Sequence, residues 1–226
     1  MQFVANIRVS EYNAKINEIY FHSCNIFINL RVYRSRSHRD RMNKTSEKLI
    51  ERLKSDDSHA QQELLTTYGE IVFRQIARIV FCQEDAEEVY QDVFLKAFRH
   101  IDSYDTSQAS LSTWLSRIAY NESLNFIRKR KPPILYVDDR ETDLESIQEE
   151  TLAETFQSTD DATIELIERA LDFLPPAEQA IITMFYFDDQ SIKDIAYITE
   201  QNPSTIASKL SRTRKKLYRV IKTMQR

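Results

Sequence analysis

The near absence of glycine is the feature that most restricts the fold of this chain. Its 226 residues include one glycine, Gly69. Glycine is the residue that most easily adopts the positive φ angles of tight hairpin turns, so this sequence can form few of them. Apolar residues instead recur at three- and four-residue steps from about Ser46 to Lys131 and again from about Asp161 onward, which is the period of amphipathic helices. The sequence therefore predicts an all-α protein.

The two helical stretches are separated by a segment of different composition. It opens with the proline pair at 132–133, and from Tyr136 to Asp161 it carries ten acidic residues and one base. Proline, high charge and few apolar residues are typical of a linker. We therefore predict two small helical domains, residues 42–131 and 161–226, joined by an acidic flexible linker at 132–160.

Residues 1–41 do not conform to either domain. They are net basic, and their most apolar part, "IYFHSCNIFINL", is interrupted by polar residues. This part is too short and polar to span a bilayer, and no small-residue cleavage site follows it. We expect no stable membrane insertion. Met42 directly precedes an amphipathic first helix, so we interpret it as the natural start and residues 1–41 as a disordered extension or a mis-assigned start.

The chain shows no pattern typical of a metal or cofactor site. Its two cysteines, Cys24 and Cys82, belong to no CxxC motif, and HxxxH spacing is absent. Cys82 ends an apolar run and is expected to be buried. Two cysteines cannot form a disulfide framework. We predict neither a metal nor a cofactor.

One predicted helix, in "DAEEVYQDVFLKAFRHI", has two contrasting faces. Its core stripe consists of Ala86, Val89, Tyr90, Val93, Phe94, Ala97, Phe98 and Ile101. Its other face carries Asp85, Glu88, Gln91 and Asp92. A di-metal carboxylate site would need ExxH pairs on neighbouring helices, and the chain has none. The acidic face is therefore either a solvated surface or a protein-docking surface.

The segment "SLSTWLSRIAYNESLNFIRKRK" predicts a helix with one unusual face. The only tryptophan of the chain, Trp114, falls at helical spacing with Arg117, Asn121, Asn125 and Arg128. Cations can bind phosphates, amides can bind base edges, and an aromatic ring can stack on unpaired bases, which together suit single-stranded DNA. The alternative is that Trp114 is a core residue and the polar side chains are merely solvated.

The C-terminal segment has the pattern of a helix-turn-helix. Pro175 and Pro176 open one helix, Ser191 and Asp194 form a capping box for the next, and Asn202 precedes Pro203 at the start of the last. From residue 203 to the end there are eight Lys or Arg and no acidic residue. The expected buried stripe of the last helix is Ile206, Leu210, Leu217 and Ile221. On its opposite face, small polar residues and cations are placed for base edges and phosphates; they are Ser204, Thr205, Ser208, Lys209, Arg212 and Arg214. An ordinary basic surface helix is the alternative.

These segments together resemble the extracytoplasmic-function (ECF) group of sigma-70-type RNA polymerase sigma factors. The likeness covers about Lys48 to Lys222. "DAEEVYQDVFLKAFRHIDSYD" resembles the polymerase-clamp helix of the family, and "STWLSRIAYNESLNFIRKRK" its promoter-melting helix. "LPPAEQAIITMFYFDDQSIKDIA" and "STIASKLSRTRKKL" resemble its fourth domain, which contains the helix-turn-helix.

The resemblance implies a cytoplasmic transcription initiation factor that is not an enzyme. Its expected partners are core RNA polymerase, through the clamp of the largest subunit and the flap of the second subunit, promoter DNA, and an anti-sigma factor. Asp85, Glu88, Gln91 and Asp92 would bind the clamp, and the last helix would read the −35 element. The −10 element would be opened by one set of residues, with a flipped base held near the loop from Asp105 to Ser110. That set is Ser110, Ser112, Thr113, Trp114, Arg117, Asn121, Asn125, Arg128, Lys129 and Arg130.

The chain departs from the family pattern at three places. Asn125 stands where an acidic residue is usual, Ala207 stands where a base is common, and Glu200 to Asn202 replace a turn that usually carries glycine and then an apolar residue. Two other functions compete with the sigma-factor interpretation. A free-standing helix-turn-helix regulator would leave the acidic face and the Trp114 helix without a role. A helical carboxylate hydrolase would lack histidine ligands and would not explain the basic C-terminal helix.

Overall fold

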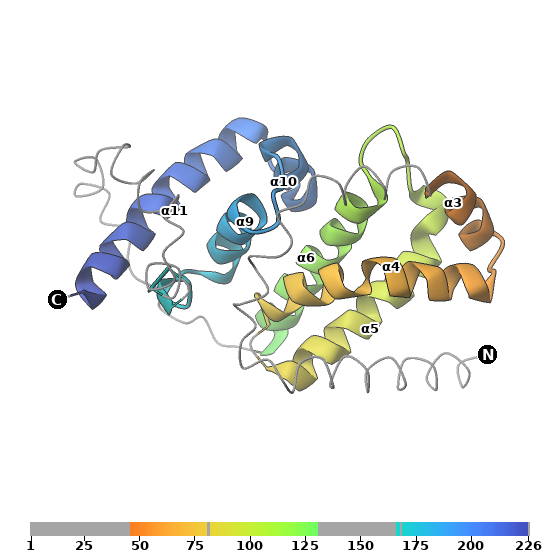
Figure 1. The fold of residues 1–226 in the computed structure, drawn as a ribbon, viewed down its shortest axis with the longest axis horizontal. Helices are drawn as coiled ribbons and strands as arrows, with labels where there is room; N and C mark the ends of the chain where they lie inside the picture. The colour runs from red at the N-terminus through yellow and green to blue at the C-terminus, as the bar shows by residue number, and fades with distance from the viewer. Residues whose placement is uncertain (1–45, 81, 131–165, 168, 226) are drawn as a thin grey trace. The chain divides into compact units, whose positions relative to one another are not determined.

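A computed structural model describes residues 46–80, 82–130, 166–167 and 169–225. Within these ranges every regular element is a helix, so the predicted all-α class is confirmed (Figure 1). The predictions made for residues 1–41 and for the acidic linker lie outside the described residues. All the described helices belong to one compact unit, Asn43–Arg226.

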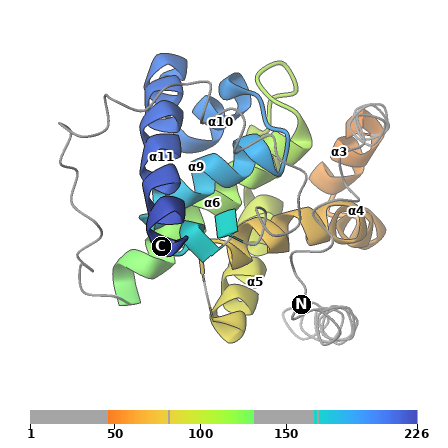
Figure 2. The same ribbon diagram turned by 60° about the vertical axis from the view of Figure 1, so that its left-hand side comes forward.

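The first set of helices is built around three long ones. It comprises α3 (Ser46–Lys54), α4 (Ser58–Ala77), α5 (Gln83–His100), the short 3-10 helix η2 (Ile101–Ser103) and α6 (Leu111–Arg130). Helices α4, α5 and α6 pack against one another (Figures 1 and 2). The predicted core stripe of α5 is confirmed, because all its members are buried except Phe98, which is half-buried.

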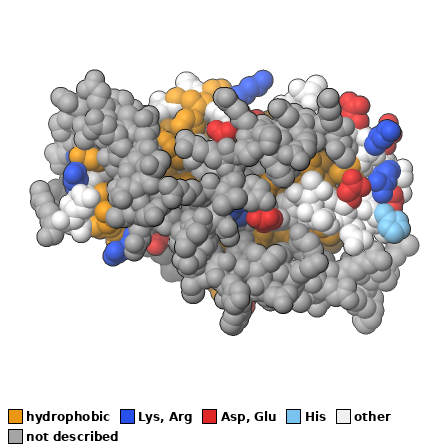
Figure 3. Space-filling model, in the orientation of Figure 1, with side chains coloured by type: hydrophobic (Ala, Val, Ile, Leu, Met, Phe, Trp, Pro, Cys, Tyr) orange, Lys and Arg blue, Asp and Glu red, His pale blue; other side chains and the backbone are white. Residues whose placement is uncertain are grey.

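Charged groups shape the start of this set of helices. Asp57 caps α4, since its Oδ1 accepts a hydrogen bond from the His59 N–H at 2.8 Å. Arg52 of α3 pairs with Glu63 of α4, with 2.8 Å between Nη1 and Oε2. Side chains of both charges gather at this end of the molecule (Figure 3). Cys82 was predicted to be buried but is exposed, because α5 begins directly after it and the chain turns at the surface there.

The second set of helices forms the predicted helix-turn-helix. It contains α9 (Pro176–Tyr186), α10 (Ile192–Thr199) and α11 (Pro203–Met224). The capping box is confirmed: Ser191 Oγ accepts from the Asp194 N–H at 3.1 Å, and Asp194 Oδ2 accepts from the Ser191 N–H at 3.3 Å. Asn202 is the residue before α11, but its side chain makes no capping hydrogen bond. The predicted stripe of Ile206, Leu210, Leu217 and Ile221 is buried, together with Thr213.

The described turns of this protein contain no glycine. Gly69 lies buried inside α4 and occupies no turn. Among the described residues, positive φ angles occur at Asp56 (54°), Asp189 (51°) and Glu200 (57°). Aspartate adopts this left-handed conformation more readily than most residues, whereas for glutamate it costs about 1–2 kcal/mol. Glu200, which ends α10, is therefore the exceptional member of the three.

The two sets of helices share a hydrophobic core. Ile79 of the α4 end and Tyr120 of α6 belong to the same buried cluster as Ile181, Ile195 and Ile206 of the second set. Helix α6 packs against α10 as well as against α4 and α5 (Figure 2). The sequence predicts the two sets of helices separately but does not predict this packing between them.

Candidate polymerase and nucleic-acid interfaces

The acidic face of α5 is accessible and contains an apolar residue. Glu88, Gln91 and Asp92 are exposed, and Asp85 is half-buried. Leu95, with 45% of its surface exposed, lies on the same face because it follows Asp92 by three residues and Glu88 by seven. The sequence analysis missed Leu95, although this spacing signals it. An exposed apolar side chain bordered by polar ones is typical of a protein-binding surface.

The end of α6 meets the start of this acidic face. The Arg130 guanidinium pairs with the carboxylates of Asp85 and Glu88, the latter at 3.5 Å, and lies over the Phe126 ring at 4.6 Å from its centroid. A cation assigned to DNA by the resemblance thus contacts two residues assigned to polymerase. Arg128 and Lys129 are exposed. The half-buried Asn125 accepts a hydrogen bond from Arg128 Nη2 at 3.0 Å.

Trp114 is a core residue in this structure. Only 7% of its surface is exposed, and its ring packs against Tyr104, with 5.4 Å between the ring centroids. The expectation that Trp114 shares an accessible face with Arg117 and Asn121 is therefore wrong, because Tyr104, which directly follows η2, lies against the ring. Of the two interpretations open from the sequence, the core interpretation holds.

The loop before α6 is ordered by its own hydrogen bonds. Asp105 Oδ1 accepts from Ser107 Oγ at 2.7 Å and from the Ser107 N–H at 2.9 Å, and these bonds lower the pKa of Asp105. Tyr104 donates its hydroxyl proton to the Ala109 carbonyl oxygen at 3.0 Å, and burial raises the pKa of Tyr104 to about 12. The chain thus holds this loop in a defined shape.

The hydroxyls at the start of α6 take part in capping that helix. Ser110 Oγ accepts from the Thr113 N–H at 3.1 Å and lies 2.8 Å from Thr113 Oγ1. Thr113 is buried, whereas Ser110 and Ser112 are half-buried. Of the three predicted base-pocket hydroxyls, those of Ser110 and Ser112 are therefore the more accessible.

Arg117 and Asn121 of α6 bind a residue of the helix-turn-helix. Arg117 Nη2 and Nε lie 2.8 Å and 3.1 Å from Glu200 Oε1, and Asn121 Nδ2 lies 3.4 Å from the same oxygen. The Arg117 guanidinium also lies over the Tyr197 ring, 5.0 Å from its centroid. The sequence analysis identified Glu200 only as a departure from the family turn and missed this contact.

The predicted reading face of α11 is open to solvent at its N-terminal end. Ser204, Thr205, Ser208 and Arg212 are exposed, and Lys209 is half-buried. Arg214 differs from them: it is half-buried and donates from Nη1 to Tyr186 Oη of α9 at 3.5 Å. The structure thus brings five of the six predicted residues together and turns Arg214 toward α9.

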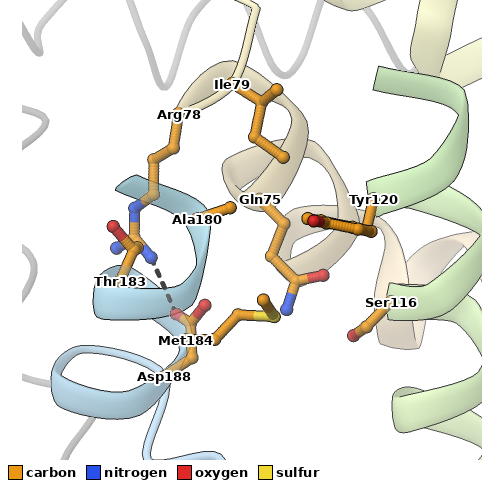
Figure 4. A pocket seen from close by; sticks show the side chains of 9 residues that line it. All are labelled: Gln75, Arg78, Ile79, Ser116, Tyr120, Ala180, Thr183, Met184 and Asp188. Atoms are coloured by element: carbon orange, nitrogen blue, oxygen red, sulfur yellow. Dashed lines mark hydrogen bonds and ion pairs between the residues drawn. The ribbon is translucent and has the colours of Figure 1, made fainter. Parts of the chain in front are cut away.

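A small hollow lies where α4, α6 and α9 meet (Figure 4). An ion pair between Arg78 Nη1 and Asp188 Oδ1, 2.9 Å long, closes one side of it, and both side chains are largely buried. Its lining residues are Gln75, Arg78, Ile79, Ser116, Tyr120, Ala180, Thr183, Met184 and Asp188. The hollow belongs to the packing between the two sets of helices.

Within the part of the chain that the structure describes, no group of three or more His, Cys, Asp or Glu side chains is arranged to hold a metal ion. None of the helices in the same ranges is long and apolar enough to cross a membrane.

Comparison with known proteins decides the family. The family model for Sigma-70 region 2 matches residues 64–132, and the model for Sigma-70, region 4 matches residues 164–217. The ECF RNA polymerase sigma-E factor of Escherichia coli is 30% identical over 176 residues, which cover 75% of this chain and 91% of that protein. This chain belongs to the ECF sigma factors. The ECF sigma factor SigW of Bacillus subtilis is 26% identical over 183 residues, covering 78% of this sigma factor and 97% of SigW.

Two solved structures share the fold. CnrH, solved in complex with the cytosolic domain of CnrY, superposes with a TM-score of 0.55 at 18% identity, covering 77% of this sigma factor and 96% of CnrH. RpoE of Bartonella quintana, solved with the anti-sigma factor NepR, gives a TM-score of 0.50 at 22% identity, covering 71% and 95%. Region 2 thus corresponds to the helices that end with α6, and region 4 to those that include α9, α10 and α11. Sigma factors are not a family of enzymes.

Proposed function

We propose that this sigma factor binds core RNA polymerase, directs it to promoters through the −35 and −10 elements and promotes strand opening. The observation that carries the proposal is the presence of both sigma regions in one chain, each with an accessible polar face on the expected helix. A free-standing helix-turn-helix regulator would account for α11 alone. The match of region 2 at residues 64–132 favours the sigma factor.

Helix α5 is proposed to dock on the clamp of the largest polymerase subunit. Glu88, Gln91 and Asp92 supply exposed polar groups, and Leu95 supplies an apolar anchor among them. Charge complementarity speeds the encounter of two proteins and fixes their register, and a few desolvated residues near the centre of an interface carry most of the binding energy. Asp85 contributes less directly, because Arg130 already pairs with it. Region 4 is proposed to meet the flap of the second subunit.

DNA recognition is proposed to divide between α11 and α6. Ser204, Thr205, Ser208 and Lys209 are placed to read base edges of the −35 element, with Arg212 on phosphates. On α6 the proposed contacts to the opened −10 strand are Arg117, Asn121, Asn125, Arg128 and Lys129, with Ser110 and Ser112 beside the flipped base. Trp114 is left out of this set because it is buried.

We further propose an anti-sigma factor as a regulatory partner and the cytoplasm as the site of action. The solved relative RpoE is itself bound to an anti-sigma factor, NepR. The cytoplasm is where core polymerase and chromosomal DNA are found.

Charge reversal on α5 tests the proposal. Glu88→Lys combined with Asp92→Lys places cations against a surface expected to attract anions, so affinity for core polymerase should fall by on the order of a hundredfold. Glu47→Lys combined with Glu51→Lys is the matched control, because it reverses two exposed acids on α3. The measurement is co-purification with core polymerase, with circular dichroism to confirm equal helical content. Equal recovery of polymerase with both double variants would remove α5 as the docking surface.

A further inference from the structure

We propose that the free sigma factor holds itself in a closed state in which Glu200 of region 4 covers the −10 face of region 2. This inference rests on the proposed role of α6 in binding the opened strand. Arg117 and Asn121 both donate to Glu200 Oε1. An anionic oxygen bound by a guanidinium is also what a DNA phosphate would present. The Glu200 carboxylate therefore occupies the donors that the strand needs.

The backbone at Glu200 indicates why a glutamate stands there. Its φ and ψ of 57° and 37° are left-handed, and its N–H donates to the Ala196 carbonyl oxygen, which ends α10. Glycine would adopt this conformation without the cost that a side chain brings, and the two other described turns of this kind use aspartate. Glutamate has the longer side chain, and its carboxylate reaches Arg117. The residue thus gives up local backbone preference and gains a contact between the two regions.

A second ion pair holds the same two regions together. Arg78, which follows α4, pairs with Asp188 of the loop between α9 and α10 at 2.9 Å, and it lies 5.7 Å from the centroid of the Phe187 ring. Figure 4 shows this pair on the opposite side of the hollow from the Tyr120 side chain of α6. The side chains of Arg78 and Asp188 are 15% and 6% exposed, against 36% and 56% for Arg117 and Glu200. The closed state is therefore held by one largely buried ion pair, Arg78–Asp188, and one exposed ion pair, Arg117–Glu200. We call the exposed pair the latch.

Closure affects the two DNA-reading faces unequally. Ser204, Thr205 and Ser208 of α11 stay exposed in the closed state. Arg117 and Asn121, by contrast, donate to Glu200, so a strand phosphate has to compete with that carboxylate for them. The free protein should therefore bind single-stranded DNA poorly until the two regions separate.

Two variants that change the net charge in opposite directions distinguish separation of the two regions from the effect of net charge on DNA binding. Glu200→Gln removes an anion and Arg78→Gln removes a cation, and each breaks one contact between the regions. Loss of a cation by itself weakens DNA binding, so tighter binding by Arg78→Gln would have to come from opening. Glu63→Gln and Arg52→Gln are the matched controls, because that 2.8 Å pair joins α3 to α4 and involves no residue of region 4.

The measurement is fluorescence anisotropy of a fluorescein-labelled, mixed-sequence single strand with the full chain, together with the radius of gyration from solution scattering. We expect Glu200→Gln and Arg78→Gln each to bind the strand two- to fivefold more tightly than wild type, a fold-change equivalent to about 0.4–1 kcal/mol. Their radius of gyration should rise. The two control variants should match wild type in both readouts.

Two results would overturn the latch: strand affinity of both opening variants equal to that of their controls, or an undiminished gain from Glu200→Gln in an Arg117→Ala background. Co-purification of each variant with core polymerase is measured in parallel. Wild-type binding to polymerase without any gain in strand affinity would reject the latch alone. Failure of every form, wild type included, to bind polymerase would reject the proposed function, while the strand-binding result would still decide the latch.

Discussion

Trp114 marks the limit of what helical spacing reveals about a single residue. Spacing places it in line with Arg117 and Asn121, and that alignment is correct along the helix. Its environment is set by Tyr104, which lies outside α6 and packs on the indole ring. A sequence pattern within one helix cannot show which of its turns another segment covers.

Because the chain contains one tryptophan, its fluorescence tests this burial directly. We expect the emission of the native protein to be blue-shifted relative to the urea-unfolded chain and to be quenched weakly by iodide. Addition of single-stranded DNA should leave the emission unchanged. Trp114→Ala should lower the free energy of unfolding by about 3–5 kcal/mol, as expected for a large core side chain. Strong iodide quenching of the native protein, or quenching by DNA, would return Trp114 to the strand-binding face.

Glu200 is a second residue whose contacts the sequence does not reveal. The sequence reveals that Glu200, Gln201 and Asn202 form the turn in which the family usually has a glycine and then an apolar residue. It does not reveal that the turn keeps the left-handed conformation or that the carboxylate reaches a helix 79 to 83 residues earlier in the chain.

At the scale of single helices, the sequence predicts most of what the structure contains. The capping box at Ser191 and Asp194, the start of α11 at Pro203 and the buried stripes of α5 and α11 all follow from local rules, and all are confirmed. These features depend on residues within a few positions of one another. The spacing of Leu95 places it on the acidic face of α5, but spacing alone does not show that this leucine is exposed.

The proposed roles on α11 separate base reading from phosphate binding within one helix. Replacing Arg212 by alanine should weaken binding about uniformly across promoter sequences and lower the salt slope by roughly one unit. Replacing the half-buried Lys209 should change the preference at one base, by about 1–3 kcal/mol. Lys222→Ala, at the exposed far end of the same helix, is the charge-matched control. The measurement is the affinity of the complex of polymerase and sigma factor for promoter DNA, at several salt concentrations and with single-base changes in the −35 element. A uniform effect of Lys209→Ala on every sequence would show that it does not read bases.

At the scale of the whole molecule, the sequence predicts the parts and misses their packing. The two family regions and their order are visible in the motifs, and the comparisons confirm them. The contact of α6 with α10, and the pairs Arg117–Glu200 and Arg78–Asp188, join residues distant in sequence. No periodicity or local motif encodes such pairs, because they depend on how two finished surfaces fit.

The proposed interfaces differ in their accessibility. The α5 face and the N-terminal end of α11 are accessible, whereas Arg117 of α6 is paired with Glu200 of region 4. Under the proposed roles, polymerase and the −35 element therefore bind before α6 is free to hold an open strand.

Permanganate reactivity of promoter thymines tests the central claim that this chain opens promoters. Templates are the host chromosomal fragments that give run-off transcripts with core polymerase plus the chain. We predict reactive thymines at the −10 element only when both proteins are present. Asn121→Ala and Arg128→Ala should keep polymerase binding but lose this reactivity on duplex templates, and a template with an unpaired −10 element should restore much of the Asn121→Ala defect. Reactivity that does not depend on the chain, or normal opening by both variants, would contradict the account.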